Sequence, residues 1–114
     1  MAGCLFCQIA SGDIDADVVY QGESTLAFRD IHPQAPVHLL VIPKEHLSNA
    51  ADLTHGHGPL LAEMVATAQW VAKSEGVGES GYRLVMNVGE DGGQTVGHLH
   101  LHVLGGRPMT WPPG

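Results

Sequence analysis

Apolar residues in the first third of the chain are spaced as they are in β-strands. Residues 18–20 and 25–29 form two short strand-like runs, and the Gly-Glu pair at 22–23 predicts a turn that joins them into a hairpin. Residues 37–42 are apolar on both faces, which is typical of a central strand, and a proline directly after them ends the run. His38 is the polar exception in this predicted strand.

The second half of the chain has one helical pattern and two further strand patterns. Between residues 59 and 74 apolar side chains recur at three- and four-residue steps, which predicts one amphipathic helix. Residues 82–88 and 98–104 predict a fourth and a fifth strand, joined by a glycine-rich connection at 89–94. Successive strands with one main helix are typical of an α+β domain with a five-stranded antiparallel sheet. A length of 114 residues suits one domain spanning residues 1–114.

Three histidines alternate with apolar residues in the fifth predicted strand. His98, His100 and His102 occupy every second position, so their rings project from one face and the intervening apolar side chains from the other. The first and last Cα atoms of this row lie roughly 13 Å apart at about 3.3 Å per residue, too far for three rings to bind one zinc. The row therefore predicts separate roles: one nucleophile, flanked by imidazoles that move protons or bind charge.

Composition and charge exclude several classes of protein. Twelve acidic against five basic residues give a net charge of −7, which argues against a groove for long nucleic acid. No apolar run approaches the ~18 residues of a membrane span, and the first residues lack the pattern of a secretory leader. We therefore expect a cytoplasmic protein with no membrane partner. In that reducing compartment, the spacing of Cys4 and Cys7 favours metal binding or redox chemistry over a structural disulfide.

The glycine-rich segment at 89–95 leaves two interpretations open. Its glycines can expose backbone N–H groups that bind phosphate oxygens, or the segment is an ordinary loop between strands. It precedes a strand rather than a helix, so it is not a dinucleotide-binding fingerprint. For His55 and His57 we expect no functional role.

Several of these segments together resemble the histidine triad (HIT) family. The signature is Asn87 to Gly106, N-V-G-E-D-G-G-Q-T-V-G-H-L-H-L-H-V-L-G-G. The similarity continues upstream through F-R-D-I at 28–31 and residues 33–44, and the ending W-P-P-G at 111–114 resembles the Hint branch of nucleoside phosphoramidases. The resemblance implies a HIT-like fold and a hydrolase or nucleotidyl transferase that acts on purine nucleoside phosphoramidates. An adenosine 5′-monophosphoramidase, which releases AMP, is an example.

The resemblance also implies residue roles. His100 would attack the α-phosphorus and form a covalent nucleotidyl-histidine, His102 would be the acid for the leaving group, and His38 would support the triad. The phosphate and leaving group would contact Asn87, Gly93, Gln94, Thr95, His98 and His102. The cleft for base and ribose would contain Phe6, Ile9, Phe28, Asp30 and Ile31, and Trp111 of the C-terminal tail would join the substrate-binding set.

A metal and a partner subunit follow from the resemblance as well. In some family members two cysteines and two histidines surround zinc, and the matching positions here are Cys4, Cys7, His46 and His98. This set suits a closed structural zinc site, and two buried thiols near a surface histidine are the alternative. The implied chemistry requires no cofactor. The resemblance further implies a homodimer in which the C-terminal tail reaches the partner.

Two other functions stay open beside the phosphoramidate hydrolase. A dinucleoside polyphosphate hydrolase is disfavoured by the W-P-P-G ending. A nucleotide-binding interaction protein with incidental catalysis is the third. The sequence does not distinguish adenine from guanine, does not identify the physiological amine, and offers no role for His32.

Overall fold

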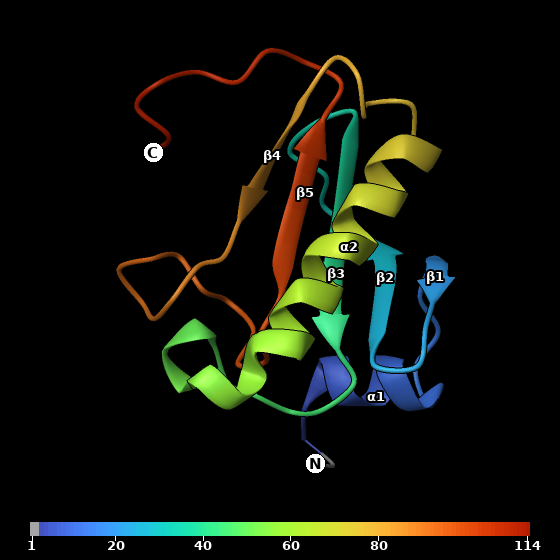
Figure 1. The fold of residues 1–114 in the computed structure, drawn as a ribbon, viewed down its shortest axis with the longest axis vertical. Helices are drawn as coiled ribbons and strands as arrows, with labels where there is room; N and C mark the ends of the chain where they lie inside the picture. The colour runs from blue at the N-terminus through green and yellow to red at the C-terminus, as the bar shows by residue number, and fades with distance from the viewer. Residues whose placement is uncertain (1–2) are drawn as a thin grey trace.

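Five strands form one antiparallel sheet in the spatial order β1-β2-β3-β5-β4 (Figure 1). The strands are Val18–Gln21 (β1), Thr25–Arg29 (β2), Val37–Pro43 (β3), Tyr82–Val85 (β4) and Leu101–Gly105 (β5). The computed structural model describes residues 3–114. Met1 and Ala2, which belong to the first residues considered above for a secretory leader, lie outside the described residues. The predicted α+β class, with its hairpin, central strand and main helix, is confirmed.

Helix α2, Gly58–Ser74, covers one face of the sheet. Its buried side chains, such as Met64 and Val71, pack against β3 and β5 residues such as Leu39 and Val103. This layer contains more buried residues than the opposite face, so it is the larger part of the core. Each buried aliphatic side chain of this kind contributes about 1.5–3 kcal/mol. No helix in residues 3–114 has both the length and the apolar character needed to cross a bilayer.

Helix α1, Leu5–Ser11, lies on the opposite face and was not expected from the pattern. Phe6 is its buried residue, and the ring packs edge-on against Phe28 of β2 with the centroids 5.3 Å apart. Leu40 and Ile42 of β3 join this second cluster, whereas the alternate residues of the same strand face α2. The sheet is therefore covered on both faces, and α1 encloses the face toward which the histidines point.

The fifth strand is shorter than the pattern predicts. It begins at Leu101 instead of His98, so His98 and His100 lie in the segment leading into it. The reason is a change of pairing partner. From Leu101 onward β5 pairs with β3 and β4, but the N–H of Leu99 donates to the carbonyl of Leu47, which belongs to a loop. The predicted strand at 82–88 also ends early, at Val85.

Candidate active site

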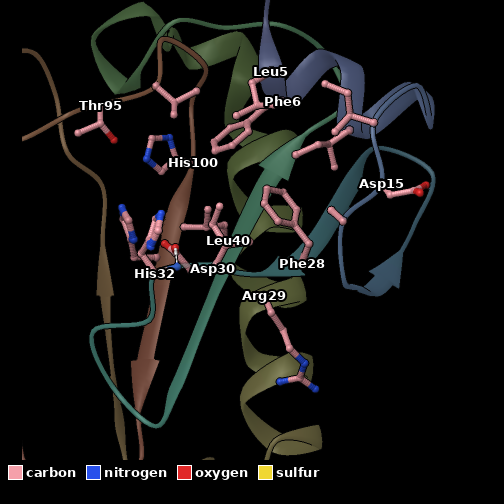
Figure 2. Close-up of a pocket in the computed structure, with 16 residues that line it drawn as sticks. Leu5, Phe6, Asp15, Phe28, Arg29, Asp30, His32, Leu40, Thr95 and His100 are labelled. Carbon is pink, nitrogen blue, oxygen red and sulfur yellow. Dashed lines mark hydrogen bonds between the residues drawn. The ribbon is translucent and has the colours of Figure 1, made fainter.

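A cavity of about 360 Å³ lies beside the histidines on the α1 side of the sheet (Figure 2). The predicted apolar residues Phe6, Ile9, Phe28 and Ile31 line it. The predicted polar residues Asp30, Thr95, His100 and His102 line it as well. In Figure 2 His32, His100, Thr95 and Asp30 gather on one side of Leu40 and Phe28. The histidines thus lie at one end of the cavity and the two phenylalanines toward the other, where Asp15 and Arg29 also line it.

Six predicted site residues do not line this cavity: His38, Asn87, Gly93, Gln94, His98 and Trp111. Gln94 braces the surrounding loops, because its amide donates to the carbonyls of Ser48 and Val96 and accepts from the N–H of Gly89. Trp111 is 83% exposed in the C-terminal tail. His98 is fully buried and faces a different cluster of side chains. A contact between its ring and the substrate phosphate has no support in this geometry.

Eight residues that line the cavity are not among the site residues predicted from the sequence, and Leu40 and His32 are two of them. Leu40 lies opposite Phe28 on one side and His102 on the other, so the strand register would have placed it on the same face. His32, to which the sequence assigns no role, also lines the cavity, and its main-chain N–H donates to the carboxylate of Asp30 over 2.8 Å. This bond holds the loop after β2 in a turn.

His100 is held in one orientation by its own backbone neighbourhood. The ring is buried, and its Nδ1 lies 2.7 Å from the carbonyl oxygen of His98. A carbonyl can only accept, so Nδ1 carries the proton and Nε2 has the free lone pair. The Phe6 ring packs edge-on against the imidazole, with the centroids 5.3 Å apart. His100 therefore presents a preorganised nucleophilic nitrogen at the cavity wall.

His102 takes its tautomer from His38. The main-chain N–H of Gln34 donates to Nδ1 of His38 over 3.0 Å, so the proton of the neutral His38 ring is on Nε2. That nitrogen lies 2.9 Å from Nδ1 of His102 and donates to it. The proton of a neutral His102 is consequently on Nε2. The ring therefore carries a donor on the nitrogen that is not engaged by His38.

Burial lowers the pKa of both His102 and His38. Burial, reinforced by the nearby His100 and His38, lowers the pKa of His102 to about 4. Burial also lowers the pKa of His38, against the opposing effect of the Asp30 carboxylate. Histidine in an unfolded chain titrates near ~6.5. Both rings therefore lack positive charge in the resting protein near neutral pH.

We expect the free energy of unfolding to fall as the pH drops from about 6.5 to about 4. In this range the unfolded chain protonates its histidines, while the folded protein keeps His102 neutral because its pKa is lowered to about 4. His102 alone would account for a loss of about 3 kcal/mol. Urea unfolding at several pH values measures this loss. The variant His102→Gln should show a shallower decline, and an identical decline would contradict the assignment.

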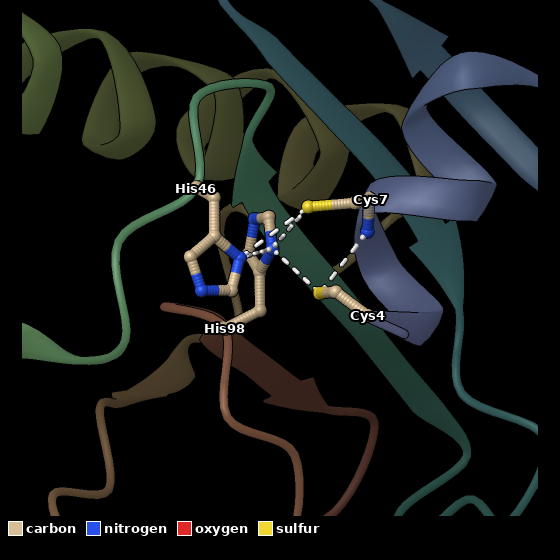
Figure 3. A group of neighbouring side chains, drawn as sticks. All are labelled: Cys4, Cys7, His46 and His98. Atoms are coloured by element: carbon tan, nitrogen blue, oxygen red, sulfur yellow. Dashed lines mark hydrogen bonds between the residues drawn. The ribbon is translucent and has the colours of Figure 1, made fainter. Parts of the chain in front are cut away.

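A second cluster of side chains lies beside α1 (Figure 3). Nδ1 of His98 lies 3.3 Å from Sγ of Cys4, 3.6 Å from Sγ of Cys7 and 3.2 Å from Nδ1 of His46. Sγ of Cys7 lies 3.3 Å from Nδ1 of His46. With bond lengths of about 2.0–2.3 Å, neighbouring ligand atoms around a tetrahedral zinc lie about 3.3–3.8 Å apart. The four side chains therefore fit such an ion.

The surroundings of His98 also suit a metal ligand. Its Nε2 lies 2.9 Å from the carbonyl oxygen of Pro43, to which it donates. The proton is thus on Nε2, and the lone pair of Nδ1 faces the two sulfur atoms. Histidines that bind metals are typically oriented by such a bond from the other ring nitrogen.

Fold and site together define a histidine triad protein, and comparison with known proteins agrees. A HIT domain matches residues 11–109. A 14 kDa zinc-binding protein of Zea mays is 48% identical over 112 residues, covering 96% of this chain and 87% of the relative. A purine nucleoside phosphoramidase of Escherichia coli K12 is 45% identical over 105 residues, covering 92% and 88%.

The similarity extends to a solved structure. The crystal structure of a HIT family hydrolase from Legionella pneumophila Philadelphia 1 has a TM-score of 0.96 at 55% identity, covering 98% of this chain and 100% of that chain. The chain belongs to the HIT family.

Proposed function

We propose that this protein hydrolyses the P–N bond of purine nucleoside phosphoramidates through a covalent nucleotidyl-histidine at His100. The observation that carries the proposal is the bond from Nδ1 of His100 to the His98 carbonyl, which leaves Nε2 as a nucleophile at the cavity wall. The phosphoramidase of E. coli, to which this chain is 45% identical, supports the choice of substrate.

The two ends of the cavity suit the two parts of a nucleotide. Phe6, Phe28 and Ile9 offer apolar and aromatic surface for a purine, and the Asp30 carboxylate can accept hydrogen bonds from ribose hydroxyls. The volume of about 360 Å³ falls within the usual range for small-molecule sites, about 300–1,000 Å³. A nucleotide oriented in this way has its α-phosphate at the end where His100 lies.

In the first step, Nε2 of His100 attacks the α-phosphorus and the P–N bond to the amine breaks. The amine must gain a proton, and His102, which lines the same end of the cavity, is the donor we propose. Burial disfavours a positive charge on His102, but the bound phosphate anion opposes that effect. Substrate binding therefore brings one proton from solvent onto His102. The products of this step are the free amine and nucleotidyl-His100.

In the second step, water attacks the phosphorus of the intermediate. The neutral His102 left by the first step accepts a proton from the water, and the resulting hydroxide forms the new P–O bond. The P–Nε2 bond breaks, its electrons return to His100, and nucleoside monophosphate leaves. His102 then releases its proton to solvent. The sum is one water consumed for each P–N bond cleaved.

Adenosine and guanosine phosphoramidates of a simple amine test this proposal directly. We expect ³¹P NMR to show conversion of each substrate to its nucleoside monophosphate, and acid-labile phosphorus to be bound to the protein during turnover. Diadenosine polyphosphate serves as the comparison substrate. Faster cleavage of the polyphosphate would favour the second candidate activity, and stable binding without cleavage would favour a nucleotide-binding interaction protein.

We also propose that Cys4, Cys7, His46 and His98 hold a structural zinc ion. The distances and the tautomer of His98 support this, and the Zea mays relative is a zinc-binding protein. Four protein ligands leave no open position to activate water, so the ion would stabilise the N-terminal segment and the proposed chemistry would not require it. Cytoplasmic location and the homodimer stay predictions.

A further inference from the structure

Asp30, His38 and His102 form a row of polar side chains that the proposed mechanism uses only in part. Oδ2 of Asp30 lies 3.4 Å from Nε2 of His38, which in turn lies 2.9 Å from Nδ1 of His102. The residues come from the loop after β2, from β3 and from β5. The mechanism assigns Asp30 to the ribose alone, so its contact with His38 has no role yet.

Hydrogen bonding decides whether this row holds a metal or a proton. Its three facing atoms lie within 4.8 Å of one another, a spacing at which they could also share a metal ion. The N–H of Gln34 donates to Nδ1 of His38, so the proton of the neutral ring occupies Nε2. A metal ligand would need a lone pair on that nitrogen. In contrast to His98, His38 is therefore arranged to share a proton.

The proton on Nε2 of His38 has two acceptors within reach. In the resting state it is donated to Nδ1 of His102, the nearer of the two. Once His102 is protonated, its Nδ1 becomes a donor and can no longer accept. Oδ2 of Asp30 is then the remaining acceptor, because it lies 3.4 Å from the same nitrogen of His38.

We propose that Asp30 is a positioning residue for the leaving-group acid, because its carboxylate accepts the His38 proton when His102 becomes protonated. The inference rests on the proposed function, in which protonated His102 supplies the amine with its proton. One proton moves from solvent to Nδ1 of His102, and the N–H of His38 turns from that nitrogen to Asp30, because two N–H groups cannot stay 2.9 Å apart facing each other. The negative charge of Asp30 also stabilises the positive charge on His102, and it raises the pKa of His102 against the effects of burial, His100 and His38.

The role predicts a specific kinetic signature for Asp30→Asn. This variant keeps the shape of the side chain but removes its charge. A phosphoramidate of an alkylamine needs a proton on its leaving group, whereas a nucleoside p-nitrophenyl phosphate has a leaving group that departs as an anion. We expect kcat to fall about 10-fold or more for the first substrate and less than about 3-fold for the second. KM should rise for both, because the ribose is the same.

A 2′,3′-dideoxy version of the alkylamine substrate separates the two roles of Asp30. It cannot make the ribose contact, so a kcat loss in Asp30→Asn that persists with this substrate comes through His38. The matched control is Asp13→Asn, which removes the same charge at an exposed position outside the cavity wall and should change kcat by less than about 2-fold. Equal kcat losses for both leaving groups, or a loss that vanishes with the dideoxy substrate, would overturn the proposal.

An NMR titration of ¹⁵N-labelled histidines provides a readout without turnover. The titration midpoint of His102 should be lower in Asp30→Asn than in the wild type and unchanged in Asp13→Asn. The groups that face His102 are His100, His38 and Asp30, and Arg29 and His32 line the same cavity. An unchanged midpoint in Asp30→Asn would contradict the inference. If the wild type cleaved neither substrate, the proposed function would fail, while the titration would still decide on the contact between Asp30 and His38.

Discussion

His100→Ala is expected to reduce turnover of nucleoside phosphoramidates by about 10³-fold or more. His100 is the ring whose Nε2 is left free at the cavity wall by the bond from Nδ1 to the His98 carbonyl. No other histidine of the row has this arrangement, because His98 is buried in the Cys/His cluster and His102 bonds to His38. Steady-state kinetics with the adenosine phosphoramidate measures the loss.

Three further observations separate loss of the nucleophile from loss of the fold. The variant should still unfold cooperatively, and its free energy of unfolding should fall only by the cost of a small cavity, about 1–3 kcal/mol. The protein-bound phosphorus seen in the wild type should be absent from the variant. His55→Ala, a change at an exposed histidine outside the site, should retain full activity. Near wild-type kcat in His100→Ala would eliminate covalent catalysis by this residue.

Cys7→Ser is expected to lose bound zinc and to lower the free energy of unfolding by about 3 kcal/mol or more. The metal binds only the folded arrangement of α1, the loop that carries His46, and the segment before β5. Its binding free energy therefore adds to the stability of the fold. In a domain of this size the unfolding temperature should drop by about 10 °C or more. Elemental analysis of the untagged protein and thermal unfolding measure the two effects.

The control for this prediction is Ser11→Ala, at the exposed end of the same helix, which should keep its zinc. Gentle chelation of the wild type tests the chemistry separately. Activity should persist as long as the protein stays folded. Wild-type protein that contains no metal would favour the interpretation of two buried thiols. Loss of activity on chelation with the fold intact, reversed by zinc, would show that the metal takes part in catalysis.

The sequence predicted the main elements because burial leaves a periodic signature. Helix α2 packs against the sheet through residues at three- and four-residue steps, and β3 is covered on both faces, so both segments carried a clear pattern. Helix α1 was not predicted because seven residues are too few to establish a helical period, and the helix buries only Phe6. The start of β5 was misplaced because His98 and His100 alternate like strand residues but do not pair with a strand.

The sequence by itself determined that three imidazoles project to one side of the sheet and that one zinc cannot bind them all. Only the tertiary structure decided their partners. It places His98 beside Cys4 and Cys7 at the start of α1, and it places His100 and His102 along the cavity. The physical reason is that a ring's tautomer depends on the group at hydrogen-bond distance from its other nitrogen. For His98 and His102 those groups belong to Pro43 and His38, more than fifty residues away in the chain.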